Sequence, residues 1–280
     1  LREALAGRLW ERVRDIVATA VEQQGLLHHE LTAARIECRN MLAIQALKES
    51  LSRDSASGNI GELLGNPVIA FTALDAAIDQ AQCVTTGEAV EELPKLTACA
   101  RRIRTIRWAL RNNDLEALGS AVGFVAEKVD GSFLEISFGI GWSPKSQAEF
   151  LQAKREFIDA VACNDLKKAL DAGAFSGEPG ALEKPSKESL DDMAAKLRRA
   201  QELQHTSLQT RRLIRSGNII QRVRLAAMSG SWHELNILLR STKITTTIQV
   251  TEPVIASEPE LLIQDTQRAE WNMLAAHAKY

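Results

Sequence analysis

The chain of 280 residues is 45% hydrophobic and 25% charged, which is the composition of an ordinary globular protein and excludes disorder along its whole length. Its formal net charge of −2 excludes the strong overall positive charge from which nucleic-acid-binding proteins draw most of their affinity, so we expect no nucleic-acid partner. The four cysteines lie far apart, without the close pairs of zinc or redox motifs, and are expected to be small buried residues.

Leucine, isoleucine and alanine recur at spacings of three and four through most of the sequence, which predicts an all-α fold. Two segments depart from this pattern, 133–144 and 242–259; together they are rich in β-branched and aromatic residues, and both end in proline and are expected to be extended. In chain order, the expected helices cover residues 1–23, 28–54, 68–82, 89–112, 115–128, 146–171, 187–216, 219–229, 232–241 and 260–278.

Several features recur after about 115 residues, which indicates an internal repeat. The matched positions have the same chemical character: apolar residues align with apolar residues, and helix-capping residues align with helix-capping residues. The matched pairs are Ala46 with Ala160, Leu74 with Leu190, Ile106 with Val223, Ala109 with Ala226, Asp114 with Ser231, Leu118 with Leu235, and Pro144 with Pro259.

A shorter pattern repeats within each long unit, in which a helix ends in small residues and Asp or Ser caps the next helix after a tight turn. It occurs in WALRNNDLEAL, AVACNDLKKAL and AAMSGSWHEL, with Asp114, Asp165 and Ser231 as the expected caps. Ser231 and Glu234 have the spacing of a capping box. Helical hairpins are therefore expected to begin near Ala46, Ala109, Ala160, Ala226 and Ala276.

Hairpins of this kind cannot bury their apolar faces singly, so the sequence predicts an irregular α-solenoid with a super-repeat of about 115 residues and two short extended inserts. The alternative is one compact helical bundle. The solenoid would be a single continuous array over residues 1–280. It would contain N-terminal helices in 1–39, a first unit in about 40–150, a second in about 155–265, and the start of a further hairpin in 266–280.

No catalytic signature is present: the histidines do not form HExxH, and neither GxSxG nor a phosphate-binding glycine motif occurs. We therefore expect no enzyme activity, no catalytic residue, no cofactor and no metal site. Without a secretory leader or an apolar run of about 18 residues, we expect a cytoplasmic protein without a membrane partner. Because the chain opens in helical periodicity without methionine, we expect it to be part of a longer protein.

The segment 96–111 of the expected helix 89–112 is dense in arginine. Its apolar stripe, which consists of Leu96, Cys99, Ile103, Ile106 and Leu110, is the expected core face. Trp108 lies among the arginines of the neighbouring stripe, which suggests an anchor for a partner. The alternative is a solvated helix face, with Trp108 packed beneath the next hairpin.

The corresponding region of the second unit, 211–224, is again arginine-dense, and Arg224 occupies the position of Arg107. Equivalent positions of a solenoid tend to line one surface, so the two helices are expected to build a discontinuous basic ridge for acidic tails or helices of partner proteins. The predicted partner-binding residues are Arg104, Arg107, Trp108, Arg111, Arg215, Arg222 and Arg224.

The stretches ALDAAIDQAQ, LPKLTACARRIRTIRWALRNNDLEALGSAV and LKKALDAGAF resemble the Ala/Leu-rich helical-hairpin arrays of large protist scaffold proteins, including proteins of the flagellar axoneme. The resemblance implies a non-enzymatic structural or docking role beside microtubule-associated partners. Two other functions stay open: an enzyme with an unannounced site, and a calmodulin-type target. The latter requires Ile103, Ile106 and Leu110 to be exposed.

Overall fold

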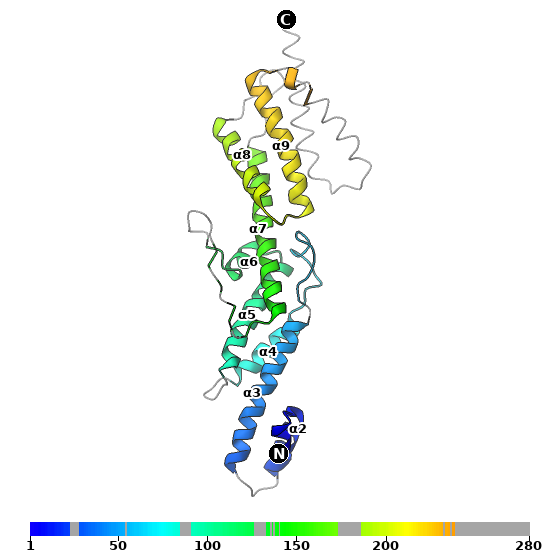
Figure 1. Ribbon diagram of the computed structural model, residues 1–280, viewed down its shortest axis with the longest axis vertical. Helices are drawn as coiled ribbons and strands as arrows, with labels where there is room; N and C mark the ends of the chain where they lie inside the picture. Colours follow the sequence, from blue (N-terminus) through cyan, green and yellow to red (C-terminus); the bar gives the residue numbers. More distant parts are fainter. Residues whose placement is uncertain are drawn as a thin grey trace. The chain divides into compact units, whose positions relative to one another are not determined.

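The computed structural model is mostly α-helical (Figure 1). Among the described residues no strand occurs, and a single antiparallel bridge joins Phe124 to Phe133. The prediction of an all-α chain is therefore confirmed. The structure describes residues 1–22, 28–53, 55–84, 91–125, 133–134, 136, 138–139, 141–172, 186–231, 233–235 and 237–238.

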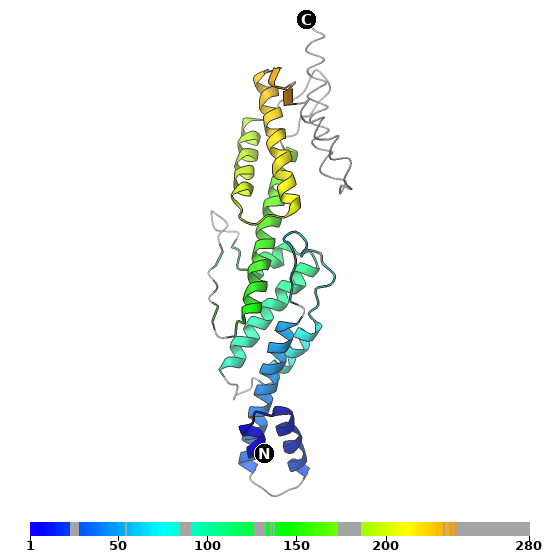
Figure 2. The same ribbon diagram turned by 45° about the vertical axis from the view of Figure 1, so that its right-hand side comes forward.

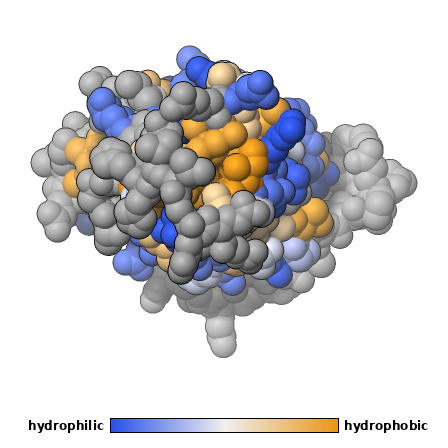
Figure 3. Space-filling view, turned by 90° about the horizontal axis from the view of Figure 1, so that it is seen from below, coloured by the Kyte–Doolittle hydropathy of each residue, from blue (hydrophilic) through white to orange (hydrophobic). Residues whose placement is uncertain are grey.

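The chain divides into two compact units, unit 1 over Leu1–Phe157 and unit 2 over Ile158–Tyr280. On the face drawn in Figure 3, hydrophobic residues gather near the middle, with hydrophilic residues beside them. Within the described part of the chain, no helix is long and apolar enough to cross a membrane.

Unit 1 begins with helices α1 (Arg2–Ala6) and α2 (Trp10–Glu22), where one helix was expected. The break follows Gly7, because Arg8 adopts the left-handed region at φ 52°. Helix α2 packs on α3 (His28–Ser52), and α1 packs on α2. Residues of all three helices, including Val13, form a small core.

The rest of unit 1 is built on the second half of α3. Helix α4 (Thr72–Gln82) and helix α5 (Glu92–Arg111) lie beside it, and α6 (Leu115–Ala121) follows α5 after a tight turn (Figures 1 and 2). The Asp114 side chain accepts a hydrogen bond from Ala117 N at 2.9 Å, so it caps α6 as the sequence predicts. The apolar stripe of α5 is fully buried.

The described residues of the insert expected at 133–144 form one isolated bridge and no strand, and their aromatic rings pack on Phe150 and Phe157. Phe133 bridges to Phe124, and Leu134 N donates to Gly123 O at 2.8 Å. The rings of Phe124 and Phe133 pack on Phe157, with centroids 5.0 and 6.1 Å from it. The second insert, 242–259, lies outside the described residues, as do helix 260–278 and the hairpin near Ala276.

Helix α7 (Pro144–Ala172) is continuous, so the hairpin expected near Ala160 is wrong. Asp165 does not cap a helix; its carboxylate lies 3.6 Å from Lys196 Nζ. The helix continues because Leu166 and Leu170 keep the spacing of a buried stripe and pack in the core of unit 2. Pro144 begins this helix instead of closing the preceding insert, as proline can at a first helical turn.

Unit 2 is built from the second part of α7 together with α8 (Lys187–Glu202) and α9 (Leu208–Ser229), which lie alongside it (Figures 1 and 2). The expected helix 187–216 is broken after Glu202. Ser207 then caps α9 by accepting from Thr210 N at 3.1 Å, while its own N–H donates to the buried Asp159 carboxylate at 2.9 Å. Residues 233–235 and 237–238 are helical again.

Gly217 lies inside α9, where a break between helices was expected. A Cβ at this position would stand 2.8 Å from Leu197 Cδ2, so glycine permits the close approach of α8 and α9. The sequence alone suggests a helix breaker here, but the contact with α8 explains the glycine better.

Replacing Gly217 with valine should destabilise the protein by about 1–3 kcal/mol, because the added methyl groups overpack the α8–α9 contact. Chemical denaturation followed by circular dichroism measures the change. Asn218→Val, at a half-exposed position next along α9, is the matched control and should cost less than about 1 kcal/mol. Equal losses in both variants would show that the close approach is unimportant.

Candidate partner-binding surfaces

Arg107 is buried, with 1% of its surface exposed, so the expectation that it belongs to an exposed ridge is wrong. Its guanidinium forms a two-pronged ion pair with the equally buried Glu149, at 2.7 Å from Nε to Oε1 and 3.0 Å from Nη2 to Oε2. It also donates to the carbonyls of Ser50 and Leu51 at 3.5 and 3.3 Å. Arg107 therefore holds the end of α3, whose last carbonyls lack partners within the helix.

Arg224 is also buried, with 0% exposed, and the same correction applies to it. Its Nη2 donates to Leu170 O at 2.8 Å, near the end of α7, and its Nη1 lies 3.4 Å from the sulfur of Met193. A buried guanidinium must satisfy its donors, and the carbonyls of a helix end provide acceptors. The correspondence between Arg107 and Arg224 therefore extends to their role, although not to a surface.

Two buried carboxylates of α7 hold the loop that follows α3. Glu149 accepts from Ala56 N at 3.0 Å, in addition to its ion pair. Glu156 accepts from Gly61 N at 2.7 Å and from Leu63 N and Leu64 N at 3.3 Å each. Sequence reasoning missed both residues, because the backbone groups that they hold lie more than ninety positions away.

The ends of α5 and α9 have the same backbone geometry. Asn113, at φ 54°, and Gly230, at φ 69°, are both left-handed. The next residue donates back to the helix in each case, Asp114 N to Ala109 O at 2.9 Å and Ser231 N to Ala226 O at 3.0 Å. These are the bonds of a Schellman motif, and they fall at positions that the sequence comparison pairs.

When α9 is aligned with α5 so that Ala226 pairs with Ala109, the buried positions of the two helices match. The buried residues Leu213, Ile220 and Val223 coincide with buried residues of α5, and no buried residue of either helix falls on an exposed one. Two exposed apolar residues coincide as well: Trp108 is 37% exposed and Leu225 is 49% exposed, and each follows the buried arginine. The two helices therefore expose corresponding faces.

The exposed part of α5 carries three of the predicted residues close together. Arg104 donates to the Asp75 carboxylate at 2.7 Å, and this hydrogen bond raises the pKa of the guanidinium. Arg104 and Arg111 both lie over the Phe71 ring, 5.7 and 5.6 Å from its centroid, within the range of a cation–π contact. Trp108 lies between these arginines in the helical sequence.

The loop before α4 adds a second apolar residue near the end of α5. Gly65 N donates to Leu110 O at 2.7 Å, which ties the loop to the last turn of the helix. Three residues later Val68 exposes 82% of its surface, and three further on lies Phe71, beneath the two arginines. We call Val68, Phe71, Arg104, Trp108 and Arg111 the α5 surface.

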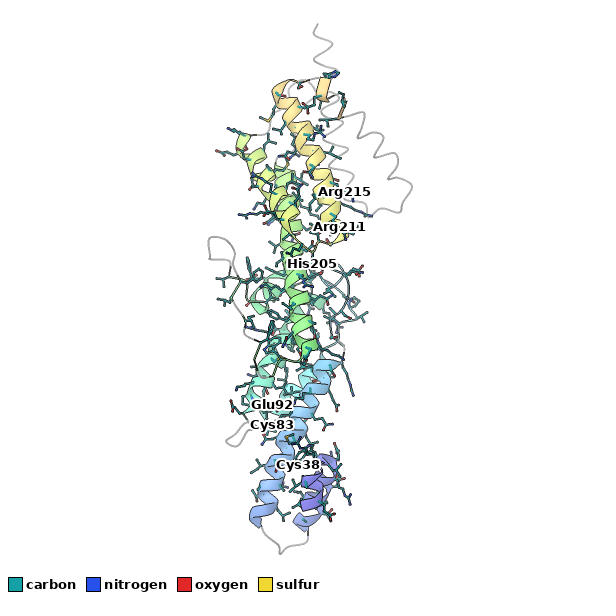
Figure 4. All side chains as sticks on the ribbon, viewed as in Figure 1. Cys38, Cys83, Glu92, His205, Arg211 and Arg215 are labelled. Carbon is teal, nitrogen blue, oxygen red and sulfur yellow. The ribbon has the colours of Figure 1, made fainter. Side chains whose placement is uncertain are left out.

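On α9, Arg215 and Arg222 are exposed, as is Arg211 one turn before Arg215. Figure 4 labels Arg211 and Arg215 on this helix. The α5 surface and these arginines belong to different units. They are two separate basic regions. The buried Arg107 and Arg224, which were expected to belong to a common ridge, are part of neither region.

The burial of Ile103, Ile106 and Leu110, each 0% exposed, counts against the calmodulin-type target, which needs these side chains on the surface. In the part of the chain that the structure describes, no group of three or more His, Cys, Asp or Glu side chains could hold a metal ion.

The chain matches no protein-family model, no curated protein and no solved structure.

Replacing Arg107 with methionine should lower the free energy of unfolding by about 3–5 kcal/mol, because it leaves the Glu149 carboxylate buried without its partner. Arg104→Met removes the same charge from a partly exposed ion pair and should cost less than about 1 kcal/mol. Denaturant titrations measure both. In the double variant Arg107→Met/Glu149→Leu much of the loss should disappear; an additive result would argue against the pair.

Three of the four cysteines are buried, but Cys83 is exposed, which corrects the expectation for that residue. Burial raises the pKa of the Cys99 thiol to about 11 and also raises that of Cys38. Because the thiolate is the reactive form, a raised pKa lowers reactivity at neutral pH.

In the native chain at about pH 8, Cys83 should therefore react with a disulfide reagent much faster than the other thiols. Absorbance of the released thiolate measures the number of fast-reacting groups. We expect one fast thiol in the native protein and none in Cys83→Ser; a fast phase that survives this substitution would show that a buried cysteine is accessible. When the original chain is unfolded in denaturant, all four cysteine thiols should react with the reagent.

Proposed function

We propose that this chain is a non-enzymatic interaction segment of a larger scaffold, and that it docks acidic protein partners through the exposed basic faces of α5 and α9. The α5 surface carries the proposal: Trp108 is 37% exposed beside Arg104 and Arg111, which lie over Phe71. Tryptophan and arginine are enriched at the centres of protein interfaces. A partner carboxylate would pair with Arg111, while an apolar group would cover Trp108.

The charge pattern supports an acidic partner. Arg104 already has Asp75 as a counter-ion, whereas no carboxylate of the described residues lies within ion-pair distance of Arg111. Ordering Arg111 against a partner therefore requires no internal ion pair to break. Val68 supplies a further apolar contact at the same end of the helix.

The proposal includes the repeat architecture. We propose that α3, α4, α5 and α6 of unit 1 correspond to the second part of α7, α8, α9 and the helical residues 233–235 and 237–238 of unit 2, as two units of an α-solenoid. The identical C-terminal bonds of α5 and α9, their aligned burial and their buried arginines support this correspondence. In repeat proteins, exposed faces of this kind are the common binding surfaces.

The resemblance to protist scaffold arrays extends the proposal to a cytoplasmic, cytoskeletal setting, with microtubule-associated proteins of the flagellar axoneme as partners. This part rests on composition and on the pattern of helical hairpins, and the exposed basic faces are consistent with it.

Trp108→Ala combined with Arg111→Glu should weaken incorporation of the full chain into its native assembly about tenfold or more, because it removes an interface anchor and reverses a charge. Co-sedimentation of the tagged chain with the assembly, over a series of salt concentrations, measures the effect. The loss should be smaller at high salt, where charge attraction is already screened.

Arg53→Glu is the control, since it reverses a 69% exposed arginine of unit 1 that is not one of the α5-surface residues. This control should assemble like the original chain. The proposal fails if the α5-surface variant and Arg53→Glu assemble equally well while circular dichroism shows both to be folded.

A further inference from the structure

The outward face of α9 carries a narrow basic stripe. Arg211, Arg215 and Arg222 are all exposed, and a helical projection places them on one side of the helix. Figure 4 labels Arg211 and Arg215. Leu208 and Leu225 are 59% and 49% exposed, one near each end of the stripe. We call these five residues the α9 stripe; from its first to its last residue it spans about 26 Å of helix.

The fold does not require these arginines. When Ala226 is set against Ala109, the α9 positions of Arg211, Arg215 and Arg222 correspond to Pro94, Ala98 and Thr105 of α5, which are also exposed. The corresponding helix therefore folds with short, uncharged residues at all three positions. This internal comparison separates the stripe from the buried Arg224, which has a counterpart in Arg107 and a role in packing.

The charge of the stripe is available to a partner. Among the residues that the structure describes, no carboxylate lies within ion-pair distance of Arg211, Arg215 or Arg222; Arg211 Nε only donates to Ser207 O, at 3.4 Å. Three like charges within three turns repel one another, which makes an oppositely charged occupant favourable.

We propose that the α9 stripe binds an acidic helix of a partner protein that lies along α9. Carboxylates of that helix would face the three arginines, and an apolar residue beyond each end would cover Leu208 and Leu225. The inference rests on the proposed function and names the chemistry of one partner. A nucleic acid fits less well, because the stripe has leucines at its ends and no aromatic residue on which bases could stack.

The test uses the full 280-residue chain and a synthetic helix-forming peptide of about 18 residues, with leucines at both ends and glutamates spaced as the arginines are. Fluorescence anisotropy of the labelled peptide measures its Kd. The variant Arg215→Ala/Arg222→Thr carries the residues that α5 has at these positions, so it should stay folded. We expect its affinity to fall about tenfold or more. Arg215→Gln/Arg222→Gln is a second variant with the same expected loss.

Two controls distinguish binding through the α9 stripe from nonspecific attraction between charges. Arg198→Ala/Arg199→Thr removes two exposed arginines from α8 and should leave the Kd unchanged within about twofold. A peptide with glutamine in place of each glutamate should bind the original chain about tenfold more weakly or not at all.

The inference is overturned if the glutamate peptide does not bind the original chain, or if the α8 and α9 variants lose equal affinity for it. It is also overturned if duplex DNA or anionic vesicles bind the same arginines more tightly than the peptide does, or if the chain self-associates and only the α9 variants abolish that self-association. The last would assign the stripe to a second copy of the chain. If the peptide fails while the α5-surface variant still weakens assembly, only this inference falls; if neither surface matters, the proposed function falls as well.

Discussion

The buried ion pair between Arg107 and Glu149 is the interaction on which the arrangement of unit 1 depends. It joins α5 to α7, and through the carbonyls of Ser50 and Leu51 it also fixes the end of α3. Burying two charges is costly unless both are paired, so an arrangement of these elements that separated Arg107 from Glu149 would be strongly disfavoured. The loop after α3 follows from it, because Glu149 also accepts from Ala56 N.

Unit 2 uses a buried arginine at the corresponding place with different acceptors. Arg224 reaches the end of α7 through Leu170 O, as Arg107 reaches the end of α3. The element that both arginines share is a helix terminus whose carbonyls need donors. An arginine-rich helix can therefore contain residues of two kinds, those that satisfy a neighbouring helix end and those that remain on the surface.

The sequence predicts the helical class, the Asp114 cap and the core stripe of α5, because these depend on neighbours within about four positions. It cannot separate buried from exposed arginines: Arg107 lies beside the core stripe, and its partner Glu149 is 42 residues away. It also misreads Gly217 as a break and Asp165 as a cap. In both cases a contact between helices, with Leu197 or within the core of unit 2, decides the outcome over local preference.

Under the proposed repeat, aligned positions of α5 and α9 keep their structural role while their surface chemistry changes. The residue after the buried arginine is Trp108 in one helix and Leu225 in the other, and both are exposed. The two helices differ more at the charged positions, since the arginines of the α9 stripe align with short, uncharged residues of α5. Because specificity is a difference between affinities, such changes can direct the two faces to different partners while the buried contacts preserve the fold.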